Sequence, residues 1–180
     1  MNYLYHMKPL EQQGDTLYPL TDLESINPDI YQQQKSKYDG REHVMDQRIP
    51  PLGNCAWNAV IFMSAVSPDA LNATRVDVGF PPITHRSYYQ IDPTTLDQDQ
   101  LTVYTFPDGR RFNETTDFKE YRYEDLEEYS RIPEATKRYY RQELDSGQKY
   151  VRLAWRFIPH ILYKGRINVS ECPVVTPENP

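Results

Sequence analysis

Residues 52–71 read Leu52-Gly-Asn-Cys-Ala-Trp-Asn-Ala-Val-Ile-Phe-Met-Ser-Ala-Val-Ser-Pro-Asp-Ala-Leu71 and contain the longest apolar run of the chain, Ala59–Met63. A short apolar run closed by a turn signal is typical of a strand buried on both faces. The signal here is Ser67-Pro68-Asp69: a capping hydroxyl, a proline at the first helical position and a carboxylate near the positive end of the helix dipole. The stretch therefore predicts a strand, a tight turn and a helix over Pro68–Val76, and we expect the rest of the chain to pack onto it.

Further strands and helices are predicted on both sides of this stretch. The predicted strands are Tyr3–Met7, Ser87–Ile91, Leu101–Phe106 with Arg110–Asn113 as a hairpin partner, Gln148–Ile158, Ile161–Tyr163 and Arg166–Val169. The predicted helices begin at Thr21 and at Pro28 (ending near Tyr38), cover Arg41–Gln47 and Tyr123–Tyr129, and run from Pro133 to Gly147. Mixed in this order, they predict an α+β fold: a single domain over residues 1–172, a mixed but mostly antiparallel sheet, surface helices, and a loose tail over residues 173–180.

The segment Gln148–Ile158 shows the strictest alternation of apolar and polar residues. Val151, Leu153, Trp155 and Phe157 are expected on one buried face of a strand. Arg152 and Arg156 lie four residues apart, so a strand would point both to its other face. Two guanidinium groups on one face can grip a phosphate or a carboxylate. The alternative is a solvated face whose arginines pair with glutamates.

Composition limits the classes of function. The chain has 180 residues and a formal net charge of −6, so nucleic acid is not the default partner. It has no apolar segment long enough to span a membrane, and its first residues lack the features of a signal peptide. The two cysteines are therefore expected as free thiols in the cytoplasm. The four histidines show no metal-ligand spacing, so no metal site is expected.

Several short motifs in the first half, taken together, resemble rifampin-type ADP-ribosyltransferases. Tyr5-His6 is followed by Gly14-Asp15-Thr16-Leu17-Tyr18-Pro19, similar to the family's Tyr-His strand and its Gly-Asp-x-Leu-x-Pro segment. The run 61–65, with the helix start at 67–70, resembles the family's second strand and the helix after it. Residues 87–93, which end in Ile-Asp-Pro, resemble the next strand. The resemblance covers roughly the first 100 residues.

The resemblance implies an NAD site. His6 matches the histidine that bonds the nicotinamide-side ribose of NAD, and Tyr5 precedes it on the same strand. Phe62 falls where the family has a tyrosine that stacks on nicotinamide. The acidic residue that would stabilise the positive charge left when nicotinamide departs is one of Asp92, Asp97 and Asp99. Met7-Lys8 departs from the small residues usual after the histidine.

Two functions remain open at this point. One is an NAD-dependent ADP-ribosyltransferase with an unknown acceptor. The other is a non-catalytic domain that binds a protein or a small ligand, using the Arg152 and Arg156 face. The two are distinguished by whether His6, Phe62 and an aspartate converge on one cleft.

Overall fold

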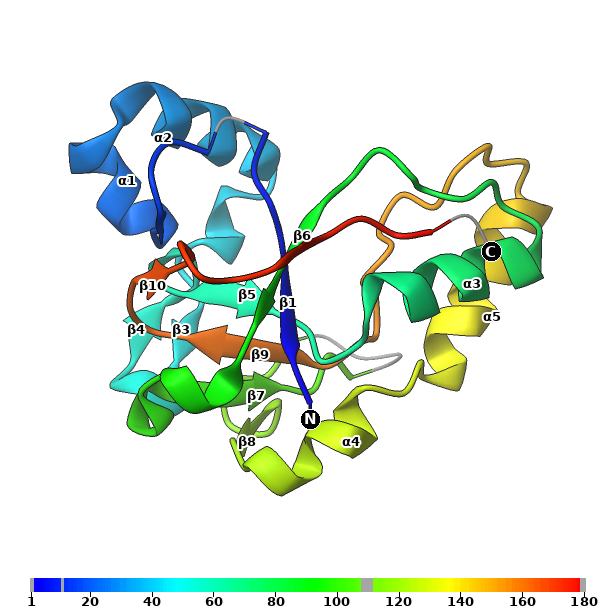
Figure 1. Ribbon diagram of the computed structural model, residues 1–180. Helices are drawn as coiled ribbons and strands as arrows, with labels where there is room; N and C mark the ends of the chain where they lie inside the picture. The colour runs from blue at the N-terminus through cyan, green and yellow to red at the C-terminus, as the bar shows by residue number, and fades with distance from the viewer. Residues whose placement is uncertain (1, 11, 108–111, 179–180) are drawn as a thin grey trace.

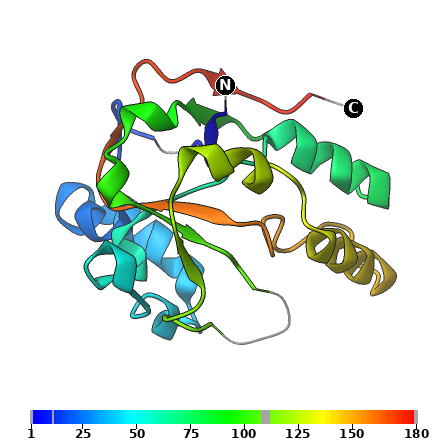
Figure 2. The same ribbon diagram turned by 90° about the horizontal axis from the view of Figure 1, so that it is seen from below.

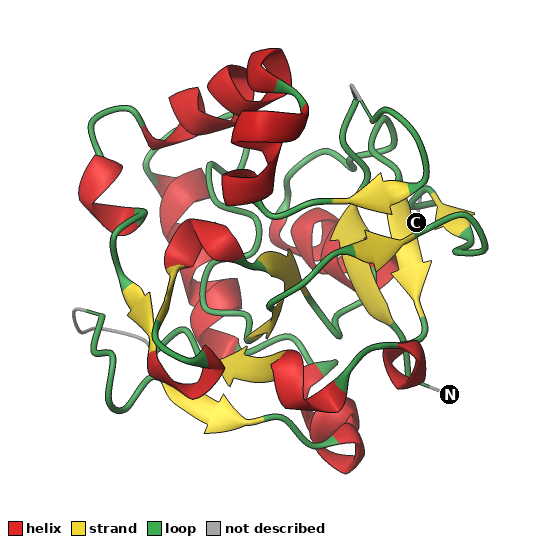
Figure 3. Cartoon of the chain, turned by 90° about the vertical axis from the view of Figure 1, so that its left-hand side faces the viewer, coloured by secondary structure: helices red, strands yellow, loops and turns green. Residues whose placement is uncertain are grey.

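A computed structural model describes residues 2–10, 12–107 and 112–178. The predicted α+β fold is confirmed: helices surround small antiparallel sheets in one compact unit (Figures 1 and 3). The larger helices are α1 (Leu20–Ile26), α2 (Pro28–Lys35), α3 (Pro68–Val78), α4 (Leu126–Tyr129) and α5 (Glu134–Asp145). Short 3-10 helices cover Ser36–Tyr38, Glu42–Val44, Pro50–Leu52, Trp57–Ala59, Pro93–Thr95, Gln98–Gln100 and Tyr123–Asp125.

Two antiparallel sheets form the centre of the molecule. One has the order β1 (Leu4–Met7), β6 (Tyr88–Ile91), β11 (Val174–Val175). The other has the order β5 (Ile61–Met63), β9 (His160–Tyr163), β7 (Leu101–Tyr104), β8 (Phe118–Glu120). Two further strand pairs are β2 (Thr16–Leu17) with β10 (Ile167–Asn168), and β3 (Arg48–Ile49) with β4 (Cys55–Ala56).

Among the described residues, one isolated β-bridge joins the two central sheets. Tyr5 in β1 exchanges backbone hydrogen bonds with Ser64, directly after β5, at N–O distances of 2.8 and 3.0 Å. The strand from the apolar run therefore pairs with β9 and is followed directly by the bridge to Tyr5 of β1, where the sheets cross (Figure 1). Its burial is less complete than predicted, because Ile61 and Met63 are buried whereas Phe62 is only half-buried.

Helix starts were predicted correctly where a cap is local. The Ser67 hydroxyl accepts from the backbone N–H of Ala70 at 3.1 Å, and Gly79 ends α3 in the left-handed conformation with φ 112°. The Asn27 side chain likewise accepts from the N–H of Ile30 at the start of α2. Figure 2 shows α3 and α5 side by side, with α1 and α2 at the other end of the molecule.

The prediction of a strand over Gln148–Ile158 is wrong. The segment forms turns, and Leu153 is 47% exposed while Val151 is buried. Two of its carbonyl groups accept hydrogen bonds from side chains of α5. The Tyr140 hydroxyl donates to the carbonyl of Ala154, and the Thr136 hydroxyl donates to that of Arg156 at 2.9 Å. These carbonyls are hydrogen-bonded by helix side chains, so they do not require the backbone of a neighbouring strand as a partner.

The prediction of a loose tail is wrong for residues 173–178. Val174 and Val175 pair with β6, and the carbonyl of Pro173 accepts from the N–H of Gln90 at 2.8 Å. The backbone of Glu178 is held by Asp69 and by the buried Asn72 of α3. The hairpin arm expected at Arg110–Asn113 falls mostly outside the described residues, and β7 pairs with β8 instead.

Candidate functional site

Two adjoining cavities lie where β1 meets β5. The first has a volume of about 560 Å³, and its walls come from the loop after β1, from β2, α1 and α2, and from β5. The second has a volume of about 590 Å³ and is lined by the end of β1, by residues before β6 and by the start of β9. Five residues line both: His6, Pro9, Gln34, Lys37 and Phe62.

His6 stands at this junction as a neutral hydrogen-bond acceptor. Its Nδ1 lies 2.7 Å from the carbonyl oxygen of Phe62, and because a carbonyl only accepts, Nδ1 carries the proton. Burial lowers the pKa of His6, and the charge of Lys37 lowers it further, while the bond to Phe62 opposes both. The neutral ring therefore keeps an unprotonated Nε2, which can accept a hydrogen bond from a ligand hydroxyl.

Phe62 offers an apolar ring to both cavities. It is held from behind by Trp57, at 5.0 Å between ring centroids, and by its strand pairing with Leu162 of β9. A half-buried ring fixed in this way is suited to stacking on a flat ligand ring. His6 and Phe62, which the sequence resemblance places at one site, thus do meet there.

Tyr5 lies on the same strand but lines only the second cavity. Its backbone makes the bridge to Ser64, and burial raises the pKa of its phenol. Tyr5 is therefore part of the wall beside His6 rather than a second residue of the first cavity.

His160 is a cavity residue that sequence reasoning missed. It begins β9, lines the second cavity, and its ring centroid lies 6.2 Å from that of Phe62. Its Nδ1 is 2.7 Å from the carbonyl of Ile158, and burial lowers its pKa, so it too presents an unprotonated Nε2. Nothing local marks it, since it reaches Phe62 through the pairing of strands about 100 residues apart.

The three candidate aspartates are not brought to the cavities. Asp92 and Asp97 cap the short helices that follow them, accepting from the N–H groups of Thr94 at 2.9 Å and of Asp99 at 3.1 Å. Asp99 is exposed in the second of these turns. None of the three belongs to either set of lining residues, and the carboxylates of Asp92 and Asp97 serve as local helix caps.

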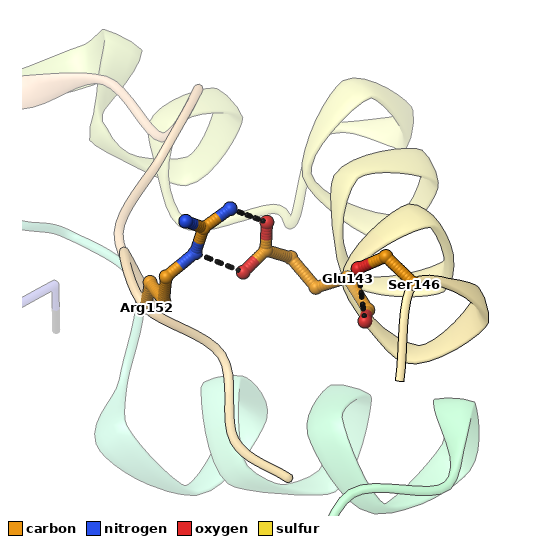
Figure 4. A network of polar contacts seen from close by, with 3 residues as sticks. All are labelled: Glu143, Ser146 and Arg152. Atoms are coloured by element: carbon orange, nitrogen blue, oxygen red, sulfur yellow. Dashed lines mark hydrogen bonds and ion pairs between the residues drawn. The ribbon is translucent and has the colours of Figure 1, made fainter. Parts of the chain in front are cut away.

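The strand that would place Arg152 and Arg156 on one face is absent, and Arg152 follows the alternative interpretation, in which the arginine pairs with a glutamate. Arg152 makes a bidentate ion pair with Glu143 of α5, at 2.9 and 2.8 Å (Figure 4). This pair lowers the pKa of Glu143, whose backbone carbonyl also accepts from Ser146. Arg156 lies over the rings of Tyr139 and Phe157, at 4.7 and 4.8 Å from their centroids. Both guanidinium groups are thus engaged within the chain.

The charges around the cavities are of one sign. Within residues 2–10, 12–107 and 112–178, the walls contain Lys8, Lys37 and Arg86 and no aspartate or glutamate. The described part of the chain also shows no group of three or more residues able to hold a metal ion. No helix in that part is both long enough and apolar enough to span a membrane. The site therefore favours an anionic organic ligand over a cation.

Comparison with protein-family models, with curated proteins and with solved structures gave no significant match.

Proposed function

We propose that the first cavity binds NAD, with the nicotinamide end at His6 and Phe62. The observation that carries the proposal is the 2.7 Å contact between the His6 ring and the Phe62 carbonyl, at a cavity that is also lined by Gly14, Thr16, Leu17 and Tyr18. The cavity is thus lined by residues from three of the four segments on which the resemblance to ADP-ribosyltransferases rests, and residues 87–93 are not among its lining residues. The three segments are distant in sequence and lie around one cavity.

The chemistry of the lining supports a dinucleotide. A volume of about 560 Å³ is within the range of cofactor sites. Leu17, Leu23 and Ile30 supply apolar walls, and Lys37 supplies a positive charge for phosphate. In this arrangement Phe62 packs on the nicotinamide ring, and Nε2 of His6 accepts from a ribose hydroxyl.

The transfer of ADP-ribose is the activity that the resemblance implies, and NAD when bound supplies the ADP-ribosyl group. The described walls offer no carboxylate to stabilise the positive charge on the ribose. They do offer His160, which can take a proton from an acceptor. The missing carboxylate favours a second candidate function, a non-catalytic domain that binds a small ligand in the same cavity.

Titration with NAD tests the proposal. At 100 times the dissociation constant, NAD should stabilise the fold by about 2.7 kcal/mol, a rise in melting temperature of about 5–10 °C. His6→Ala and Phe62→Ala should each remove most of the shift. His43→Ala is the matched control, because His43 is exposed and lies outside both cavities. An unshifted parent protein would refute NAD binding.

Release of nicotinamide then separates the two candidates. Steady release from NAD that His6→Ala abolishes supports a transferase-type enzyme, and binding without release supports the non-catalytic domain. Asp92→Asn, Asp97→Asn and Asp99→Asn should change neither binding nor release. If one of them stops release while leaving binding intact, that aspartate is catalytic after all.

We propose the cytoplasm as the location. Cys55 and Cys172 are unpaired and pack against different clusters of buried side chains. Unpaired thiols are typical of proteins in reducing compartments. Thiol titration of freshly purified protein without reductant should find two thiols, whereas a Cys55–Cys172 disulfide would contradict this location.

A further inference from the structure

The second cavity gathers three cations from three separate elements. Lys8 follows β1, Lys37 belongs to the short helix Ser36–Tyr38, and Arg86 precedes β6. All three side chains are exposed to solvent, so a ligand can reach them. The chain has a formal net charge of −6, so this positive cluster is opposite in sign to the protein as a whole.

None of these cations is neutralised within the described part of the chain. Arg86 donates to the sulfur of Met7 at 3.3 Å, Lys37 donates to the side-chain oxygen of Gln34, and Lys8 lies 5.6 Å from the centre of the Tyr89 ring. The ion pairs found there involve other residues. Partial desolvation of its ammonium group lowers the pKa of Lys37, although the residue as a whole is exposed, and the charge of Arg86 lowers it further, so these two cations repel one another.

The second cavity also has aromatic side chains in its wall. Tyr5, Trp155 and His160 line it, and Phe62 lines both cavities. Unneutralised cations next to aromatic rings match a ligand with a phosphate group and a flat ring: the cations bind the phosphate and the aromatic side chains stack on the ring. Arg86 provides the planar fork that suits phosphate oxygens.

We infer that the second cavity binds a nucleoside monophosphate-like ligand, alongside whatever occupies the first cavity. The inference rests on the proposed function only in assigning the first cavity to NAD. Lys8 and Arg86 line the second cavity alone, whereas Lys37 is shared by both. The second ligand is therefore recognised by Lys8 and Arg86, and Lys37 contacts both ligands.

Uridine 5′-monophosphate is a suitable probe, because the adenosine phosphates are fragments of NAD. Calorimetric titration of the full chain should give one site for the monophosphate and at least tenfold weaker binding of uridine. Arg86→Gln and Lys8→Gln should each weaken the monophosphate by roughly 10- to 100-fold, as expected for loss of a hydrogen bond to a charged group. Arg141→Gln, which removes an exposed cation outside both cavities, is the matched control.

The same variants separate this inference from the proposed function. Arg86→Gln should leave NAD affinity within about twofold, and saturating NAD should not displace the monophosphate. If Arg86→Gln weakens NAD, or NAD displaces the monophosphate, the cations belong to the NAD site and the inference is overturned. No monophosphate binding, or a single-stranded RNA bound far more tightly than the monophosphate, also overturns it. A parent protein that binds the monophosphate and fails to bind NAD refutes the proposed function alone.

Discussion

Two regions of the molecule place arginines beside aromatic rings, and they use them in opposite ways. Near α5, Arg152 is paired with Glu143 and Arg156 covers two rings, so each charge has a partner within the chain. In the second cavity, Arg86 and the two lysines have no described aspartate or glutamate beside them in the cavity wall. The comparison indicates that the role of a cation depends on whether another residue of the chain neutralises its charge. A paired cation supports the fold, and an unpaired one is free to bind a ligand.

The largest effect is expected where α5 holds the segment that carries the paired arginines. Tyr140 is fully buried, and its hydroxyl donates to the carbonyl of Ala154. Tyr140→Ala should lower the free energy of unfolding by about 3–5 kcal/mol. Tyr140→Phe should cost about 1–3 kcal/mol, because the carbonyl of Ala154 loses its partner. Urea denaturation measures both, and a neutral Tyr140→Phe would show that the hydrogen bond does not hold the segment.

Trp155 connects the two regions and should give a smaller loss. It lies in the segment that α5 holds, yet it is only half-buried and lines the second cavity. Trp155→Ala should therefore cost about 1–2 kcal/mol of unfolding free energy, below the value for a fully buried aromatic ring. The substitution should also weaken the uridine monophosphate complex. A loss above about 3 kcal/mol would mean that Trp155 is a core residue and not a wall of the cavity.

As the pH falls, protonation of the cavity histidines should lower the free energy of unfolding at a higher pH than protonation of Glu143 does. The folded protein lowers the pKa of His6 and of His160, so below about pH 6.5 the unfolded chain binds the protons first and the free energy of unfolding decreases with falling pH. Glu143 also has a lowered pKa, and its contribution is lost only as the pH falls below the usual glutamate range. Denaturation at a series of pH values should show both steps. His6→Gln with His160→Gln should flatten the first, and an unchanged profile would contradict the neutral histidines.

The smallest effects should distinguish the cations themselves. Arg152→Gln removes the partner of Glu143 and should lower the melting temperature slightly, because the arginine side chain is 62% exposed and the pair is partly screened by solvent. Arg86→Gln relieves repulsion and should leave the melting temperature unchanged or raise it slightly. Differential scanning calorimetry at low salt measures both changes in melting temperature: a decrease for Arg152→Gln, and no change or an increase for Arg86→Gln. A clear loss of stability in Arg86→Gln would show that this arginine is structural.

The sequence was most informative where the relevant signal is local. Caps at Asn27 and Ser67 are satisfied within three residues, so the starts of α2 and α3 followed from short patterns. Alternation over 148–158 failed because it does not say whether a partner strand exists, and α5 takes the place of one. The same distinction between local and long-range signals applies to the residues of the site. Motif order indicated His6 and Phe62, whereas His160 and the Lys8, Lys37 and Arg86 cluster depend on contacts between distant segments that no local pattern records.

The pairing of β1 has a consequence for synthesis on the ribosome. Met7, the last residue of β1, pairs with Tyr88, the first residue of β6, so the strand that carries His6 emerges 81 residues before its partner begins, since 88 − 7 = 81. At about 5–20 residues per second, β1 waits roughly 4–16 s without its neighbour. The strand β11 joins the far side of β6 only when residues 174–175 follow. Lys8 and Pro9 directly follow the strand. The charge of the lysine and the ring of the proline disfavour pairing of β1 with other nascent chains during that interval.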